Sequence, residues 1–414
     1  MVKRFLQSLV RKGGGEMKYF TWFFACLIGV LLCMPSFAAD SIKMGAVINL
    51  TGPASSWGKY HAKGLQDYMK YVNEVKGGVG GAKIDLTVVD HAYKVAEGIK
   101  HVKKFCEDGM VMIATWDTGL GIQVKPIIKE YKVPTINFST GQEILKPPID
   151  YMYLPFGSYV LDSQAVLEYV KAIHKGKGKP KVGLLSLDNA YGKSIHDPSK
   201  EYAGKHDIEI VGIEAFPAKT LDLSTELLKL KQGNAEYVFT QILPANMISA
   251  LKASDKTGFK PLFIGTWTAT DPDFFASAQG LIGDRLQMQF CGGLPGDNTP
   301  GVKLMEDLIK RYKTVDRYDL SYWEGVSVGM IMVRGAERAK EKFGKITSDT
   351  INQALENFNN EDFGGIIPNV TYTKDNHQGS FVARIVKVNE NGTFTPLTNF
   401  FTPGKGDLKV LKGK

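Results

Sequence analysis

The sequence predicts an α/β fold in which parallel sheets are covered by helices and arranged in two similar units. Apolar, β-branched runs alternate with amphipathic stretches along nearly the whole chain, and this alternation is typical of parallel sheets with helices on both faces. The pattern restarts near the middle of the chain, which predicts a second unit like the first. Of the 414 residues, 43% are hydrophobic and 23% are charged. This composition is that of a globular protein and excludes disordered, collagen-like and membrane-spanning classes.

The first unit follows an apolar N-terminal segment. Its apolar runs predict strands over residues 43–49, 83–90, 110–115 and 133–138. The amphipathic stretches between them predict helices over residues 60–75, 96–107 and 123–131. The run of glycines at 77–81 follows a helix and precedes a strand, which predicts a turn and not a dinucleotide-binding loop.

The second unit begins after residues 151–157. Helices are expected over residues 163–174, 197–206, 223–231 and 247–256, with strands over 181–187, 209–216, 237–241 and 261–265. A later helix pair is expected over 302–312 and 322–343, followed by a β-rich tail over 370–399. No repeat of 20–50 residues interrupts this order.

Residues 1–38 are expected to be a secretory signal peptide. A basic start precedes an apolar run, and small residues at Ser36 and Ala38 predict cleavage between Ala38 and Ala39. The apolar run is shorter than the roughly 20 residues of a spanning helix. Leu32 stands where a lipoprotein has a small residue, so we expect periplasmic release and not lipidation at Cys33. Met17, which follows a glycine-rich stretch, is an alternative start.

Charge and cysteine content exclude several functional classes. About half of the net charge of +8 lies in the leader, and no basic stripe with interleaved aromatic residues follows, so no nucleic-acid partner is expected. The seven histidines are scattered without metal-ligand spacing, and no phosphate-binding loop occurs, so neither a metal nor a cofactor is expected. Cys106 and Cys291 are expected to be free, buried thiols.

Candidate binding residues follow the expected strands. In open parallel sheets, ligands bind beyond the carboxyl ends of the strands. The corresponding loops are rich in Thr, Ser, Gly, Trp and Asn, and they cover residues 50–58, 115–121, 137–142, 188–192, 242–246 and 266–271. Hydroxyls, backbone N–H groups and flat apolar rings favour ligand binding over acid–base catalysis.

The chain from about Ile42 onward resembles the periplasmic leucine/isoleucine/valine-binding proteins, the type I solute-binding proteins of ABC importers. The resemblance rests on "MGAVINLTGPASSWGKYHAKGLQDYMKYVNEVKGGVGGAKIDLTVVD", "YKVPTINFSTG", "DNAYGKS", "DLSTELLKLKQGNAEYVFTQ" and "TGFKPLFIG", in the family's order and spacing. It implies two Rossmann-like lobes joined by three chain crossings, with one lobe formed by residues 39–156 and 291–371. The other lobe would contain residues 157–290 and 372–414.

The same resemblance implies a set of ligand-binding residues. The aromatic residue that covers the ligand corresponds to Trp57, and the hydroxyl that binds the ligand's carboxylate corresponds to Thr118. Backbone groups of Ser139, Thr140 and Gly141 would hold the same carboxylate. Further aromatic contacts are expected from the following residues: Trp116, Tyr191, Trp267 and Tyr322.

One departure from the family leaves two ligand classes open. The family's counter-charge for an α-ammonium group corresponds to Trp267, and an ammonium without a counter-charge is costly to desolvate. Asp117 or Asp271 could substitute, although Asp271 also fits a helix cap before Pro272. The ligand is therefore expected to be either an amino acid or another carboxylate or amide.

The resulting prediction is a solute-binding protein, not an enzyme. It would be a periplasmic monomer that captures a small carboxylate-bearing molecule by lobe closure and delivers it to a membrane permease. A ligand-sensing receptor module is an alternative, but no span or signalling domain follows the leader. A hydrolase is a further alternative, for which no nucleophile motif occurs.

Overall fold

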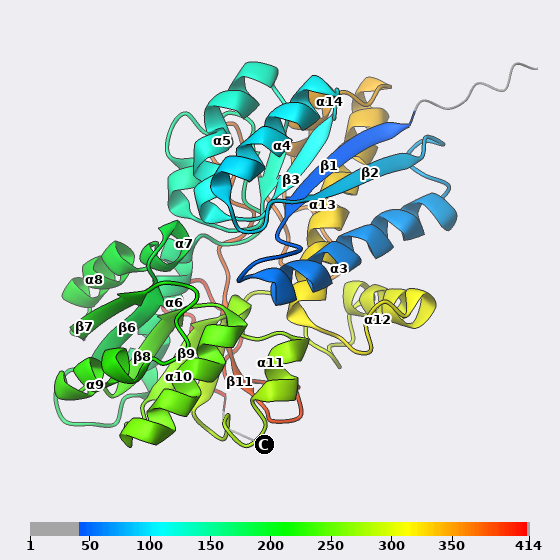
Figure 1. Cartoon of the computed structure of the whole chain (residues 1–414). Coiled ribbons are helices and arrows are strands. Elements are labelled where there is room, and N and C mark those ends of the chain that lie inside the picture. The colour runs from blue at the N-terminus through cyan, green and yellow to red at the C-terminus, as the bar shows by residue number, and fades with distance from the viewer. Residues whose placement is uncertain (1–40, 412–414) are drawn as a thin grey trace, which may run out of the picture. The chain divides into compact units, whose positions relative to one another are not determined.

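The computed structural model describes residues 41–411, which fall within one compact unit, Ser41–Lys414. Predictions for residues 1–40, including the signal peptide, Met17 and Cys33, lie outside the described residues. The described chain forms two sheets flanked by helices (Figure 1). The predicted α/β fold with helix-covered parallel sheets is confirmed.

The first sheet is entirely parallel and has the strand order β2-β1-β3-β4-β5. Its strands are β1 (Ile42–Ile48), β2 (Ile84–Asp90), β3 (Met112–Thr115), β4 (Thr135–Asn137) and β5 (Met152–Tyr153). The strand order reverses between β1 and β3, and such a switch point is where open α/β sheets bind ligands.

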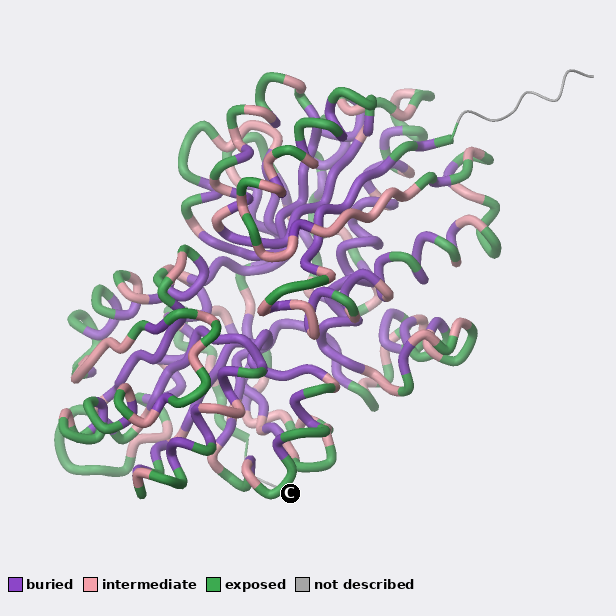
Figure 2. The backbone as a smooth tube through the Cα atoms, viewed as in Figure 1, coloured by how far each residue is buried: buried purple, intermediate pink, exposed green. Residues whose placement is uncertain are grey.

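Alternating side chains of β1 bury both faces of this sheet. Met44, Ala46 and Ile48 join the core beneath helix α3 (Ser55–Glu74). Val47 joins a separate core beneath α4 (Val95–Glu107) and α5 (Thr118–Tyr131). Strand β1 is therefore buried on both sides, and its tube is mostly purple in Figure 2, which explains its nearly continuous apolar sequence.

The second sheet has the order β12-β11-β10-β9-β8-β6-β7. Its parallel strands are β6 (Lys181–Leu187), β7 (Glu209–Phe216), β8 (Tyr237–Gln241), β9 (Leu262–Thr266) and β10 (Leu286–Phe290). The antiparallel strands β11 (Arg384–Val388) and β12 (Phe394–Pro396) extend one edge. The helices in this part of the chain are α6 (Tyr159–Ile173), α7 (Ala190–Lys193), α8 (His196–Lys205), α9 (Ser224–Gln232), α10 (Pro244–Thr257) and α11 (Pro272–Ser277).

Helix α13 (Leu320–Phe343) lies against α3 although the two are far apart in the sequence (Figure 1). The helices approach so closely that a Cβ on Gly325 would lie 2.0 Å from the carbonyl oxygen of His61. A Cβ on Gly64 would lie 2.2 Å from the carbonyl oxygen of Tyr322. Glycine on both helices therefore brings the start of α13 against the first sheet's core.

The remaining elements complete the chain and refine the sequence predictions. They are the 3₁₀ turns η1 (Gln142–Leu145) and η2 (Trp267–Ala269) and the helices α12 (Pro300–Tyr312) and α14 (Ser348–Leu355). The pattern did not predict α14, β5 or β10, and only β11 and β12 are regular strands within the predicted β-rich tail. The glycine run is a turn closed by a bridge between Val79 and Ala82, and Cys106 and Cys291 are free and buried; all three predictions are confirmed.

Candidate functional site

An internal cavity lies where the carboxyl ends of strands from both sheets meet. Side chains after β2, β3 and β4 line it together with side chains after β6, β8 and β9 and one residue each of α6 and α13. The lining residues are Tyr93, Trp116, Asp117, Thr118, Phe138, Ser139, Tyr159, Tyr191, Leu243, Thr268 and Glu324. Four predicted site residues are thereby brought together: Trp116, Thr118, Ser139 and Tyr191.

The cavity is narrow in this arrangement. Only about 10 Å³ of it can hold the centre of a water molecule. About one water molecule fits into such a space, so a larger ligand requires the walls to move apart.

A chain of hydroxyl groups runs along the cavity from the first sheet to the start of α6. Thr118 Oγ1 lies 2.6 Å from Ser139 Oγ, which lies 2.9 Å from the hydroxyl of Tyr159. Thr118 is the first residue of α5, and the side chain of Asp117 caps this helix by accepting from the backbone N–H of Leu120 at 2.9 Å. Hydroxyls at a helix start can donate to an anionic group.

Tyr191 forms the opposite wall. Its hydroxyl hydrogen-bonds to that of Thr268 and lies 3.4 Å from the carbonyl oxygen of Ile242, so the residues after β8 and β9 fix its position. Burial raises the pKa of Tyr191 to about 12, which keeps the phenol neutral and able to donate. The side-chain amide of Asn189 donates to the hydroxyl of Tyr93 at 2.9 Å and so links the two walls.

Glu324 supplies the feature that the sequence analysis missed. Only 1% of this residue is exposed, and four N–H donors converge on its carboxylate. Trp57 Nε1 donates to Oε2 at 2.8 Å, His61 Nδ1 lies 3.0 Å from the same oxygen, and Trp116 Nε1 donates to it at 3.2 Å. Trp267 Nε1 donates to Oε1 at 3.3 Å. Three indoles, from α3, from the residue after β3 and from η2, therefore meet at one carboxylate.

A sequence signal for Glu324 does exist. It is the one charged residue in the stretch "LSYWEGVSVGMIMV", which is otherwise apolar, small or hydroxyl-bearing. A charge is rarely buried without partners, so this pattern indicates either a helix face at the surface or a buried site. The sequence could not decide between the two.

Several other predicted residues lie near the cavity without lining it. Trp57 and Trp267 are fully buried behind it, where their indole N–H groups hold Glu324. Thr140 is buried next to it, and its carbonyl oxygen accepts from the backbone N–H of Tyr159. Gly141 lies beside Thr118, since a Cβ on Gly141 would approach the Thr118 methyl group to 2.5 Å.

Tyr322 is directed elsewhere. Its hydroxyl donates to Asp67 Oδ2 of α3 at 2.8 Å, and the residue does not line the cavity. The register of α13 explains this placement, because residues 322 and 324 point to different sides of one helix. The structure thus brings Glu324 to the cavity and leaves Tyr322 between the helices.

The electrostatics of the cavity are acidic. Asp117 and Glu324 are the charged residues that line it, and no lysine or arginine does so within residues 41–411. Burial raises the pKa of Asp117. No group of His, Cys, Asp and Glu in the described chain could hold a metal ion. Within residues 41–411, no helix is long and apolar enough to cross a membrane.

Comparison with known proteins gives consistent matches. A family model described as periplasmic binding protein matches residues 41–393. The Leu/Ile/Val-binding protein homolog 7 of Brucella suis biovar 1 is 24% identical over 303 residues, which cover 70% of this chain and 74% of that protein.

Solved structures extend the comparison. A branched-chain amino acid ABC transporter protein from Thermus thermophilus, crystallised with bound valine, has a TM-score of 0.81 at 26% identity, covering 88% of this chain and 97% of that one. A fatty acid ABC transporter substrate-binding protein from Thermomonospora curvata has a TM-score of 0.80 at 20% identity, covering 89% and 95%. The second likeness concerns the fold alone.

Proposed function

Because this chain belongs to the periplasmic binding protein family, we propose that it captures a small carboxylate-bearing solute for an ABC importer of the branched-chain amino acid type. Membership of the family implies solute binding outside the cytoplasm. The observation that carries the proposal is the cavity lined by strand-end residues of both sheets. Such a position suits a ligand that is held by two lobes at once.

The proposed lobes are residues 39–156 with 291–371, and residues 157–290 with 372–414. Two observations support this division. All strands of the first sheet lie within residues 42–153, whereas those of the second lie within 181–290 and 384–396. Helix α13, from the later part of the chain, packs on α3 beside the first sheet.

The ligand's carboxylate is proposed to bind at Thr118 and at residues 139–141. The support is chemical, because the hydroxyl groups here lie at the start of a helix and can donate to a carboxylate. No lysine or arginine of residues 41–411 lines the cavity to attract anions of other kinds. Tyr191 would contact the ligand from the opposite wall. Trp57 and Trp267 would act by shaping the site around Glu324.

Lobe closure is the proposed mechanism of capture. The described arrangement leaves room for about one water molecule, so solutes would enter when the walls separate. The contacts from Trp267 to Glu324 and from Asn189 to Tyr93 would break on opening and re-form on closure. A ligand that touches both walls binds the closed state better and shifts the population toward it. The closed form would then dock on a membrane permease as a monomer.

Export is proposed to depend on the leader. Cleavage between Ala38 and Ala39 would release the chain just before β1, which begins at Ile42. Mass spectrometry of the protein recovered from the periplasm tests this proposal. A mature N-terminus at Ala39 is expected, and a mass that includes a lipid on Cys33 would contradict it.

Calorimetry on refolded protein tests solute capture. The panel should contain branched-chain amino acids, aliphatic and aromatic carboxylates, and amides. We expect one class to bind with one solute per chain and to be recovered chemically unchanged. Conversion of the bound solute, or a panel without any binder, would contradict the proposed function.

The substitution Thr118→Val tests the proposed carboxylate contact. It removes a hydroxyl at nearly constant shape, so the affinity for a carboxylate ligand should fall about tenfold, as expected for a lost hydrogen bond to a charged group. The matched control is Thr395→Val, at the exposed middle position of β12. Affinities within twofold of each other for the two variants would show that Thr118 does not touch the ligand.

A further inference from the structure

The charge inside the cavity is not balanced. His61 Nδ1 lies 3.0 Å from Glu324 Oε2, whereas His61 Nε2 is buried and has no hydrogen-bond partner within residues 41–411. If the His61 ring is neutral and donates from Nδ1, its Nε2 is an acceptor without a partner. The free-energy cost of that is smaller than the cost of a buried, charged N–H without a partner. The three indoles are neutral as well. No lysine or arginine of residues 41–411 lines the cavity either, so no fixed cation faces Glu324 there.

The carboxylate has little capacity left for further donors. Three of the four converging N–H groups contact Oε2, and only Trp267 contacts Oε1, so about one acceptor position is left, on Oε1. A primary ammonium group brings three N–H donors that all need acceptors. The position on Oε1 satisfies one of them, and the other two would need further acceptors in a cavity lined by five aromatic side chains.

The other walls favour a cation without N–H groups. Five aromatic side chains line the cavity: Tyr93, Trp116, Phe138, Tyr159 and Tyr191. Tyr93 packs against Trp116 with ring centroids 6.4 Å apart, and Tyr159 packs edge-on against Tyr191 at 5.5 Å, so a cation would lie against these paired rings and not between them. The faces of such rings attract cations, and a cage of rings is a recurring binding site for quaternary ammonium groups.

We propose that the cavity binds a small zwitterion whose cationic nitrogen is fully N-alkylated, with Glu324 as the counter-charge and the aromatic rings as its walls. The inference rests on the proposed function and specifies its ligand class. It also accounts for tryptophan at position 267, where the resembled family has the counter-charge for an ammonium group. Here the carboxylate comes from α13, and Trp267 donates to it.

A series of three ligands with one carbon skeleton tests the inference. The probes are 3-methylbutanoate, which lacks nitrogen, valine, which has a primary ammonium group, and valine betaine, which is trimethylated. Calorimetry on the refolded protein should show that valine betaine binds at least about tenfold more tightly than either of the others. Glycine and glycine betaine repeat the comparison for a smaller ligand.

The outcomes separate this inference from the proposed function. If valine or 3-methylbutanoate binds as tightly as valine betaine, the inference is overturned and solute capture still stands. If no member of this series or of the wider panel binds, solute capture fails and the inference fails with it. A preference for the betaine at either ligand size supports both.

The substitution Glu324→Gln tests the role of the charge. Glutamine keeps the shape and one acceptor oxygen but removes the negative charge, so betaine affinity should fall at least about tenfold while affinity for 3-methylbutanoate is kept or rises. The control is Glu341→Gln, at an exposed position of the same helix. An equal loss for both probes would overturn the assignment of Glu324. If the variant does not fold, the ligand series on the unaltered protein still shows whether the cavity prefers the betaine.

Discussion

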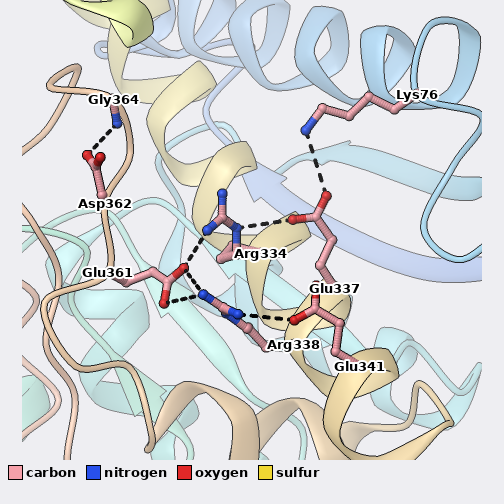
Figure 3. A network of polar contacts seen from close by, with 8 residues as sticks. All are labelled: Lys76, Arg334, Glu337, Arg338, Glu341, Glu361, Asp362 and Gly364. Carbon is pink, nitrogen blue, oxygen red and sulfur yellow. Dashed lines mark hydrogen bonds and ion pairs between the residues drawn. The ribbon is translucent and has the colours of Figure 1, made fainter.

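The two halves of helix α13 place their charged side chains in opposite environments. The C-terminal half carries a partly exposed network in which Arg334 and Arg338 both contact Glu361 (Figure 3). Its other ion pairs are Arg334 with Glu337, Arg338 with Glu341, and Lys76 with Glu337. In the N-terminal half, the carboxylate of Glu324 is surrounded by three indoles and one imidazole.

The difference shows where a residual charge can have a function. In the network each carboxylate faces a cation and solvent screens the rest, so little field remains. At Glu324 the hydrogen-bond donors are three indoles and one imidazole, so no lysine or arginine faces this buried carboxylate. The buried half can therefore select a ligand by charge, whereas the exposed half stabilises the helix surface.

The largest expected effect comes from Glu324→Ala. This change leaves three indole N–H groups and His61 without their shared acceptor, and each unsatisfied buried donor costs about 1–3 kcal/mol. The free energy of unfolding should fall by about 3 kcal/mol, because water entering the space recovers part of the loss. Urea denaturation followed by tryptophan fluorescence measures the change.

The comparison with Glu341→Ala sharpens this prediction. Glu341 lies on the same helix but its side chain is 62% exposed, so its loss should change the free energy of unfolding by less than about 0.5 kcal/mol. Equal effects of the two alanine substitutions would refute the contrast between the two halves.

A smaller effect is expected from Gly325→Ala, which tests how the buried half is positioned. A Cβ at this position would lie 2.0 Å from the carbonyl oxygen of His61, so α3 and α13 would have to separate. The cost of overpacking should exceed the gain in helix propensity and destabilise the protein by about 2 kcal/mol.

The control is Gly204→Ala in α8, where nothing lies within 4 Å of the added Cβ. This substitution should raise stability slightly, by up to about 1 kcal/mol, because alanine favours a helix. Thermal unfolding distinguishes the two cases. If Gly204→Ala destabilises the protein, or if Gly325→Ala does not, then the close approach of α3 and α13 at Gly325 is not what makes that substitution costly.

The smallest effect is expected in the exposed network. The side chain of Arg338 is 46% exposed, and Glu361 keeps Arg334 as a partner when Arg338 is replaced. Arg338→Ala should therefore cost less than about 1 kcal/mol at low salt and close to nothing at 1 M NaCl. The effect of Glu324→Ala should persist at the same salt concentration, and its disappearance would indicate that Glu324 is screened by solvent.

Local sequence patterns were sufficient for much of the fold and for part of the site. Alternating strand and helix signals predicted parallel sheets, because each signal depends on residues close together in the chain. The rule that ligands bind at strand ends then indicated the neighbourhoods of Trp116, Thr118, Ser139 and Tyr191, which do line one cavity. Short strands such as β5 and the extra helix α14 carried too weak a pattern to be predicted.

The sequence by itself thus determined the α/β architecture and the strand-end loops that surround the cavity. Only the tertiary structure decided which side of α13 faces that cavity, and so that Glu324 lies there and Tyr322 does not. The physical reason is that the rotation of a helix on its neighbours depends on contacts between distant segments, here the close approach of Gly325 to His61. Trp57, Trp116 and Trp267 meet at one carboxylate for the same reason, since no local pattern encodes distances between loops.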